Sequence, residues 1–409
     1  MNIIEIITKK KNKEELSREE LEYAFLGYLN GKVCDYQMSS LLMAICLNGM
    51  SDDETFTLVD IFIKSGDVLD LSCIDGVKVD KHSTGGIGDK ITLIIGPIVS
   101  SCGVIVPKMS GRGLGYTGGT IDKLESIDGF KVSLTEDEFI NQIKDIGFAV
   151  TSQTSNLCPL DKVIYALRDV TGTTDSIPLI ASSIMSKKIA GGADKIFIDI
   201  KCGIGAMMKN MEDALELKNI MERIGEHYNR ETICEISDMN IPLGNNIGNS
   251  LEVIEAMDIL KGKTGSLRDL SIKISTEMVR IAKGISESDA LKEVLMVLDR
   301  GIAYNKFLEF VKYQGGDINS LKVSNNIQEI KSNKTGIVKS INALNIGKLS
   351  CSLGAGRESK EAPIDYSVGI VLNKLVGDEV SINDTLFTLY KKDNKDIDIN
   401  VDDYYQINC

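Results

Sequence analysis

The sequence predicts an α/β protein with three parts: a small all-helical domain, a larger α/β domain with a central, mostly parallel sheet, and a small C-terminal β-rich (α+β) domain. Amphipathic helical patterns fill about the first 65 residues. From about residue 75 to residue 330, β-branched runs alternate with helical segments, and short β-runs with turns follow. The 409 residues suffice for two or three domains, which we place at residues 1–70, 71–330 and 335–409.

The composition argues against several classes of protein. A net charge of −13 is unsuited to a nucleic-acid surface. No apolar run approaches the roughly 20 residues that cross a membrane, so we expect a soluble, cytoplasmic protein without membrane contact. The nine cysteines form no close C-x-x-C pairs, which favours reduced thiols over disulfides or zinc.

The first 65 residues carry the signals of antiparallel helices. Ser17 and Glu20 form a capping box, and Asp35 is expected to cap a second helix. Ser51 and three acidic residues after it suit the start of a third helix. The expected ends are glycines, Gly31, Gly49 and Gly66. From the residues alone, these helices form a bundle that serves as a core.

Further elements are expected after the helices. Helical patterns cover residues 136–146, 213–229 and 250–261, and strands are expected at residues 148–151 and 195–200. In the C-terminal domain, strands are expected at residues 336–341, 368–372 and 385–390, with a tight turn at residues 377–380.

Two polar, glycine-rich loops distinguish the α/β region. Residues 81–90 read KHSTGGIGDK, and residues 108–125 read KMSGRGLGYTGGTIDKLE. Each loop follows a β-branched run that predicts a buried strand, and each precedes a helical segment. The strands are predicted at residues 77–79 and 104–106, and the helices at residues 91–101 and about 121–127.

The residue types of these loops suit a small oxyanion such as phosphate. Glycines allow close backbone approach, and helix N-termini present unpaired N–H groups with partial positive charge. Hydroxyls and cations are added by Ser83, Thr84, Thr92, Ser110, Thr117, Thr120, Lys81, Lys108 and Arg112. His82 lies within this cluster, where it can donate or position a proton.

Two familiar phosphate motifs fit the loops poorly. A nucleotide P-loop needs glycine just before its lysine, but Asp89 precedes Lys90. Residues 113–118 match the dinucleotide fingerprint letter by letter, yet several polar residues separate them from the strand that should end there. A lone match of this kind is weak evidence.

Together the two loops resemble the pyrimidine-nucleoside phosphorylase and thymidine phosphorylase family, which has an anthranilate phosphoribosyltransferase-like fold. The second loop matches the family's signature, and the likeness covers nearly the whole chain. It continues through Tyr165–Thr171, Ser182–Lys188 and Ile364–Ile370. The resemblance implies reversible phosphorolysis of pyrimidine nucleosides to free base and α-pentose 1-phosphate, with no organic cofactor. It also implies a homodimer that forms through the helical domain. Helices from about residues 160–190 are expected to belong to that domain as well.

The resemblance assigns roles residue by residue. The phosphate-binding residues are Lys81, Ser83, Thr92, Lys108, Ser110 and Thr120. Arg168, Ser183 and Lys187 correspond to the residues that contact the base, and His82 lies close to a base carbonyl. Catalysis is assigned to His82, Arg168 and Lys187. From spacing alone, Ser183 and Lys187 indicate only one solvated helix face. The two sets lie in different domains, so domain closure is expected to bring them together.

Members of the family often hold a monovalent cation, usually potassium. The corresponding positions are Gly88, Lys90, Leu243, Asn246 and Glu255. Position 90 is commonly threonine and position 246 alanine, so the chain departs from the pattern at both. A protonated lysine has no lone pair to give. Lys90 either reaches Glu255 and substitutes for the ion, or turns to solvent while the ion binds through carbonyls.

Three other functions remain open at this stage. A thymidine-restricted phosphorylase carries the same loops, and no residue decides between ribose and 2′-deoxyribose. A phosphoribosyltransferase of the same fold would bind a pyrophosphorylated sugar with magnesium, but would lack the block at residues 81–83 and the pair Arg168 and Lys187. A binding protein without activity would not need every base and phosphate residue.

Overall fold

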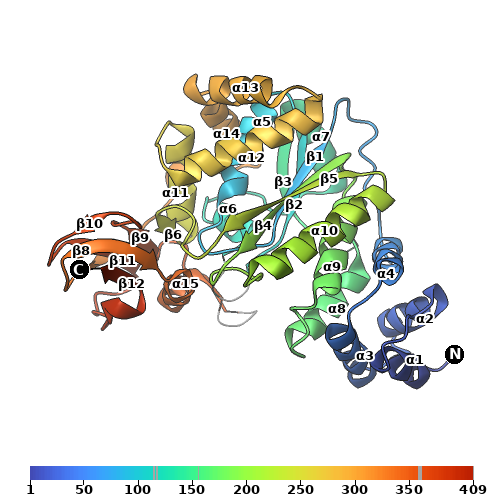
Figure 1. The fold of residues 1–409 in the computed structure, drawn as a ribbon. Helices are drawn as coiled ribbons and strands as arrows, with labels where there is room; N and C mark the ends of the chain where they lie inside the picture. Colours follow the sequence, from blue (N-terminus) through green and yellow to red (C-terminus); the bar gives the residue numbers. More distant parts are fainter. Residues whose placement is uncertain (114–115, 117, 155, 358–361, 409) are drawn as a thin grey trace. The chain divides into compact units, whose positions relative to one another are not determined.

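The computed structural model describes residues 1–113, 116, 118–154, 156–357 and 362–408 (Figure 1). The chain forms two compact units. The first unit comprises Met1–Cys73, Gln153–Ile198 and Met211–Glu235, and the second comprises Ile74–Ser152, Asp199–Asn210 and Ile236–Cys409. None of the helices in the described ranges has the length and apolar character needed to span a bilayer.

The first unit is mainly helical. Its helices are α1 (Ile3–Lys11), α2 (Arg18–Leu29), α3 (Asp35–Asn48), α4 (Asp52–Lys64), α8 (Pro159–Asp169), α9 (Ile177–Ala190) and α10 (Met211–His227). Leu21 and Phe25 of α2 are buried with apolar residues of the other N-terminal helices and of α8 and α9. The burial of this shared apolar surface holds the bundle together.

The starts of these helices agree with the prediction except at Asp35 and at helix α1. Ser17 and Ser51 form capping boxes with Glu20 and Glu54, the first as predicted. The prediction for Asp35 was wrong, because Cys34 is the N-cap residue and Asp35 accepts a hydrogen bond from the Tyr28 hydroxyl instead. Helix α1 was not predicted, since its short apolar pattern is followed by a run of lysines.

The central strands are β1 (Val79–Ser83), β2 (Val106–Ser110), β3 (Phe148–Ser152), β4 (Lys195–Cys202) and β5 (Glu231–Asp238). Strands β2 and β3 pair in parallel. A parallel bridge between Lys78 and Ile105, just before β1 and β2, connects these two strands. Strand β4 lies between β1 and β5. The predicted strands at residues 77–79 and 104–106 were placed too early. Backbone pairing continues into polar residues, as between Ser110 and Ser152, so the first residues of both predicted loops belong to strands.

The second unit also contains helices, some of which directly follow its strands. They are α5 (Ile91–Ser101), α6 (Thr120–Glu125), α7 (Glu136–Ile146), α11 (Asn249–Leu260), α12 (Ser266–Lys283), α13 (Glu287–Asp299) and α14 (Ile302–Tyr313). Helix α5, with the predicted bounds, packs with α12 and α14 (Figure 1). A side chain at Gly96 would lie 2.3 Å from the ring of Phe148, so only glycine lets α5 approach β3 this closely.

The C-terminal part is rich in short strands, as predicted. One sheet has the order β6-β9-β11-β7 and another β10-β8-β12. The strands are β6 (Asn246–Ile247), β7 (Asn326–Lys331), β8 (Gly336–Ile341), β9 (Gly369–Leu372), β10 (Glu379–Val380), β11 (Thr385–Lys391) and β12 (Tyr405–Asn408). Helix α15 (Ala343–Ser350), short 3-10 turns at Ile318–Ser320 and Val401–Asp403, and a π turn at Cys351–Ala355 complete it.

The turn predicted at residues 377–380 is displaced. Glu379–Val380 is strand β10, paired antiparallel with β8, and the turn precedes it. In this turn the side chain of Asp378 accepts a hydrogen bond from the backbone N–H of Leu375, and the backbone N–H of Asp378 donates to the carbonyl of Leu375. Gly377 adopts a φ of 95°, which favours glycine. Gly377 and Asp378 do lie in a turn, but they form its end and not its centre.

Candidate active site

Lys81 is a buried cation near the C-terminal end of strand β1, where it is the third of five residues. The residue is 1% exposed, and its Nζ lies 3.7 Å from Oδ2 of Asp199. Within the part of the chain that the structure describes, this Nζ has no hydrogen-bond partner. A buried ammonium with unused donors is costly unless an acceptor reaches it. An anion bound at this strand end would provide one.

Carboxylates around Lys81 hold the neighbouring groups in place. Asp199 pairs with Lys201 at 2.7 Å, and both contact the hydroxyl of Ser237. Asp89 accepts a hydrogen bond of 2.5 Å from Ser83. Burial by itself raises the pKa of the Asp89 carboxyl, but the charges of Lys81 and Lys201 outweigh it and hold the pKa well below its ordinary value. Asp89 is therefore a carboxylate at neutral pH.

The other predicted phosphate residues also lie at strand ends and helix starts of the second unit. Lys108 is buried in β2, donates to the carbonyl of Met109 at 2.9 Å, and lies 4.0 Å from a carboxylate oxygen of Asp80. Ser110 ends β2, Thr120 begins α6, and Thr92 is the second residue of α5. The first turns of these helices add backbone N–H donors. The arrangement suits an anion.

Two of the polar residues highlighted in the loops are used within the protein. Arg112 forms a bidentate pair with Glu125, which neutralises its charge at the surface. The hydroxyl of Thr84 accepts a hydrogen bond from the backbone N–H of Lys201 at 2.8 Å. Thr117, and with it part of the fingerprint at residues 113–118, lies outside the described residues.

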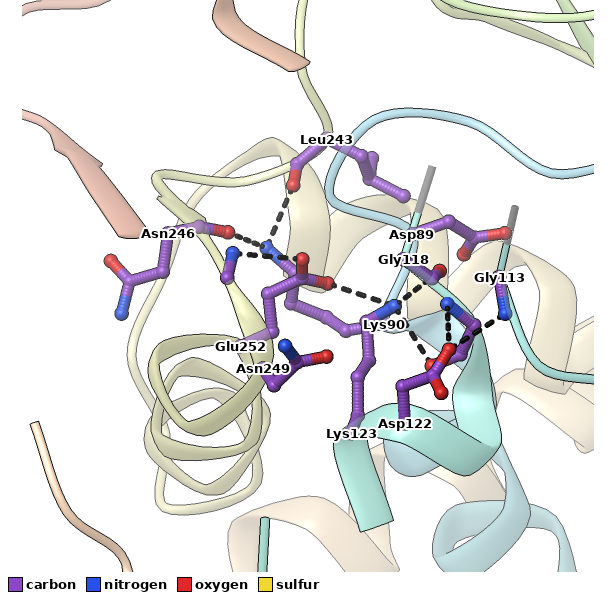
Figure 2. A network of polar contacts seen from close by, with 12 residues as sticks. Asp89, Lys90, Gly113, Gly118, Asp122, Lys123, Leu243, Asn246, Asn249 and Glu252 are labelled. Carbon is purple, nitrogen blue, oxygen red and sulfur yellow. Dashed lines mark hydrogen bonds and ion pairs between the residues drawn. The ribbon is translucent and has the colours of Figure 1, made fainter. Parts of the chain in front are cut away.

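The second glycine-rich loop is held by Asp122. Its Oδ2 accepts hydrogen bonds from the backbone N–H groups of Gly113 at 2.6 Å and Gly119 at 3.2 Å (Figure 2). Its Oδ1 pairs with Arg357 at 2.6 Å. The carboxylate therefore fixes both flanks of the loop against the start of α6.

Helices α8 and α9 bring the predicted base-binding residues together in the first unit. Nζ of Lys187 donates to Oγ of Ser183 at 2.9 Å, one turn away on α9. The same Nζ lies 2.6 Å from Oδ2 of Asp161 on α8. Sequence reasoning missed Asp161, because nothing in its local pattern marks it. The pair orients the Lys187 ammonium, whose side chain keeps 17% of its surface exposed.

Arg168 is enclosed more completely. It is 1% exposed, and its guanidinium donates to the carbonyls of Thr173, Leu179 and Thr174 at 3.0, 3.2 and 3.0 Å. These bonds tie the connection between α8 and α9 to both helices. Burial lowers the pKa of Arg168 from its ordinary value. The structure thus gives Arg168 a stabilising role that the sequence did not predict.

His82 is the penultimate residue of β1 and is partly buried between Lys81 and Ser83. It belongs to the second unit, as do the phosphate residues, while Arg168, Ser183 and Lys187 belong to the first. The other histidine, His227, is exposed at the end of α10 and stacks on Phe56 with ring centroids 4.5 Å apart.

Four of the five residues expected around a monovalent cation, all except Gly88, form one cluster of polar contacts. Nζ of Lys90 lies 2.9 Å from the carbonyl of Leu243, 2.6 Å from that of Asn246 and 2.7 Å from Oε2 of Glu255. Lys90 therefore reaches Glu255 and does not turn to solvent. The side-chain amide of Asn246 donates to the carbonyl of Leu251, so only the backbone of Asn246 contributes to this cluster.

Three family models match the chain in order. Residues 4–66 match the helical bundle domain of a glycosyl transferase family, and residues 75–304 match the a/b domain of that family. Residues 337–407 match the pyrimidine nucleoside phosphorylase C-terminal domain. A pyrimidine-nucleoside phosphorylase of Staphylococcus haemolyticus is 49% identical over 411 residues, covering 98% of this chain and 94% of that protein.

The chain belongs to the pyrimidine-nucleoside phosphorylase family. Another member, from Bacillus subtilis, is 50% identical over 398 residues, covering 95% of this chain and 92% of that protein. A solved structure, anthranilate phosphoribosyltransferase from Thermus thermophilus, matches with a TM-score of 0.58 at 17% identity, over 76% of this chain and 99% of that one. This last likeness establishes the fold alone, and it agrees with the fold class predicted from the sequence.

Proposed function

We propose that the protein catalyses the reversible phosphorolysis of pyrimidine nucleosides. An oxygen of phosphate forms a bond to C1′ of the sugar while the bond from C1′ to the base breaks. The electron pair of that bond leaves with the base, and the products are the free base and an α-pentose 1-phosphate. The observation that carries the proposal is the buried Lys81 ammonium in strand β1, which has no hydrogen-bond partner among the described residues, in a member of this family.

The geometry supports distinct roles for the two sets of residues. Breaking the glycosidic bond places positive charge on the sugar and negative charge on the departing base. Phosphate held by Lys81 and its neighbours stabilises the sugar, and the Lys187 ammonium stabilises the base. Asp161 and Ser183 position Lys187. His82 donates to or positions the base carbonyl.

Arg168 stabilises the two helices that carry the proposed base-binding residues. Its guanidinium holds the connection between α8 and α9, the two helices that carry Asp161 and Lys187. The positive charge of Arg168 also adds to the electrostatic stabilisation of the departing base.

Ultraviolet absorbance tests the reaction directly. Uracil or thymine should be released from uridine, thymidine and 2′-deoxyuridine only when phosphate is added. Comparable specificity constants for the three nucleosides are expected. Uridine turnover about a thousandfold below thymidine turnover would instead identify a thymidine-restricted enzyme. A requirement for magnesium and a pyrophosphorylated ribose would replace the proposal with a phosphoribosyltransferase.

We also propose that two copies associate through the helices of the first unit. Helix α3 carries three exposed apolar side chains, those of Tyr36, Met43 and Leu47. Met43 follows Tyr36 by seven residues, and Leu47 follows Met43 by four. Tyr36 is 72% exposed and Leu47 is 75% exposed. This spacing places all three on one helix face. An apolar stripe of this kind suits a second copy.

Light scattering after gel filtration should give twice the mass of 44.7 kDa for the protein. Leu47→Glu should reduce it to one chain. Ile382→Glu, which changes a 59% exposed apolar residue of the C-terminal part, should leave the dimer intact. A monomeric unmodified protein would refute the association.

A further inference from the structure

The ammonium of Lys90 occupies a closed set of oxygen atoms. A protonated lysine has three N–H donors. Figure 2 shows the Nζ between the carbonyls of Leu243 and Asn246, and the third acceptor is Oε2 of Glu255. The number of acceptors equals the number of donors, so the ammonium is saturated. The side chains of Lys90 and Glu255 are 0% and 1% exposed.

The oxygen set is itself fixed by the backbone. The carboxylate of Glu255 accepts hydrogen bonds from the backbone N–H groups of Asn245 and Asn246 at 2.8 and 2.9 Å. A side chain at Gly244 would lie 2.6 Å from this carboxylate, so a glycine is needed there. Burial raises the pKa of Glu255, but the charge of Lys90 outweighs this and lowers it. The pair is therefore charged and preorganised.

The cluster joins segments that are far apart in the sequence. Lys90 is the N-cap residue of α5 at the end of the first glycine-rich loop, and Glu255 lies on α11. Asn246 begins β6, which pairs with β9 of the C-terminal sheet through Val371. The ammonium thus connects the loop that carries the candidate phosphate residues to α11 and to that sheet.

A separate monovalent cation does not fit this arrangement. Three of the groups expected to bind the ion, the carbonyls of Leu243 and Asn246 and the carboxylate of Glu255, are the acceptors of Lys90. The threonine hydroxyl common at position 90 is missing. An added cation would compete for oxygens already bound and would lie against a like charge in a buried site.

We propose that the Lys90 ammonium is a built-in replacement for the monovalent cation, and that the protein neither binds potassium at this site nor depends on it. A tethered ion cannot dissociate, so its occupancy is independent of the potassium concentration outside the protein. The loop before α5 consequently stays attached to α11 under any salt. This inference rests on the geometry of the cluster and not on the identity of the nucleoside.

The unmodified protein gives the first test. Its melting temperature should be equal in potassium chloride and in tetramethylammonium chloride of the same ionic strength, and equilibrium dialysis with ⁸⁶Rb⁺ should show no bound ion at millimolar concentration. A higher melting temperature in potassium, or one rubidium ion retained per chain, would overturn the proposal.

Variants give the second test. Lys90→Thr opens the oxygen set and supplies a hydroxyl, so it should lose about 5 °C or more in tetramethylammonium, regain most of it in potassium, and retain one ⁸⁶Rb⁺. Lys90→Met should lose stability in both salts, because it opens the set without a new ligand. Lys144→Thr, at an exposed position of α7, is the control and should match the unmodified protein.

A Lys90→Thr protein that folds but shows no potassium effect and no bound rubidium would contradict the proposal. If neither variant folds, the dialysis and melting of the unmodified protein still decide it. None of these measurements depends on turnover, so an error in the proposed reaction would leave the outcome unchanged.

Discussion

The end of strand β1 and the helix pair α8 and α9 both bury positive charge, but they use it differently. At the strand end, Lys81 is enclosed and has no hydrogen-bond partner among the described residues. In the helix pair, Arg168 donates to three backbone carbonyls and Lys187 contacts a carboxylate. A cation with unused donors can bind a ligand, whereas a cation whose nitrogen atoms all donate within the fold, as in Arg168, stabilises it. Lys187 is intermediate, because only two of its three N–H donors have partners among the described residues. The difference indicates which substitutions should affect activity and which should affect stability.

The largest effect is expected for Lys81→Met. Removing this buried ammonium should lower kcat/KM for phosphate about 10³-fold, because the charge that we propose binds the anion is lost. Steady-state kinetics with varied phosphate would measure it.

Lys10→Met is the matched control for this prediction. Lys10 is equally buried but is bound by both oxygens of Glu54, so its loss should lower stability and leave the KM for phosphate unchanged. A Lys81 variant with normal phosphate kinetics would show that a buried lysine without a partner does not identify the anion site.

Lys187→Ala should lower turnover by roughly two orders of magnitude or more, since it deletes the charge that we propose stabilises the leaving base. The measurement is kcat at saturating phosphate and nucleoside. Lys162→Ala, at an exposed position of α8, should keep normal turnover. More than about half of the original activity in the Lys187 variant would remove this lysine from the reaction.

His82→Ala should lower the rate by roughly 10²-fold if the imidazole supplies a proton to the base. The pH profile of kcat/KM should then lose one limb near neutrality. His227→Ala serves as the comparison and should have normal kinetics and an unchanged profile. A slower His82 variant with an unchanged profile would leave this histidine with positioning alone.

In contrast to the three substitutions above, Arg168→Met should lower the stability of the protein directly. Three carbonyls would lose their donors, which should cost about 3 kcal/mol of the free energy of unfolding. Urea denaturation would measure this change, and Arg168→Lys should recover part of it. Full stability of the Met variant would show that the three bonds are not what holds the α8–α9 connection.

The smallest effect is expected for a partly buried surface group, Asp60. Partial burial raises the pKa of its carboxyl, but hydrogen bonds with Lys64 and Arg18 lower it further, to below the ordinary value of 3.8. Because the pKa is lower in the folded protein, the stabilisation is fully present above the ordinary pKa of 3.8 and is lost as the pH falls through the lowered pKa. Asp60→Asn should cost only about 0.5 kcal/mol at pH 7 in low salt. The difference should shrink as the pH falls through the lowered pKa of Asp60, as unfolding measured at neutral and at acid pH would show.

Much of the fold was determined by short-range sequence signals. The capping box at Ser17, the bounds of α5 at Ile91–Ser101 and the strand at Gly336–Ile341 were predicted from neighbouring residues. The glycine-rich loops indicated an anion site, because glycine, hydroxyl and charge were dense within a few positions. Such signals are readable because caps, periodicity and turn chemistry act over about four residues.

Only the tertiary structure decided how the charged residues are used. Asp161 meets Lys187 across 26 positions, and Glu255 meets Lys90 across 165. The three carbonyls that Arg168 reaches, and the lack of a hydrogen-bond partner for Lys81 among the described residues, are equally invisible in a string of residues. Whether a buried cation is satisfied depends on which distant oxygens the fold brings within about 3 Å, and no local pattern specifies that distance. The sequence determined where positive charge gathers, and the packing of remote segments decided which charges remain available for a ligand.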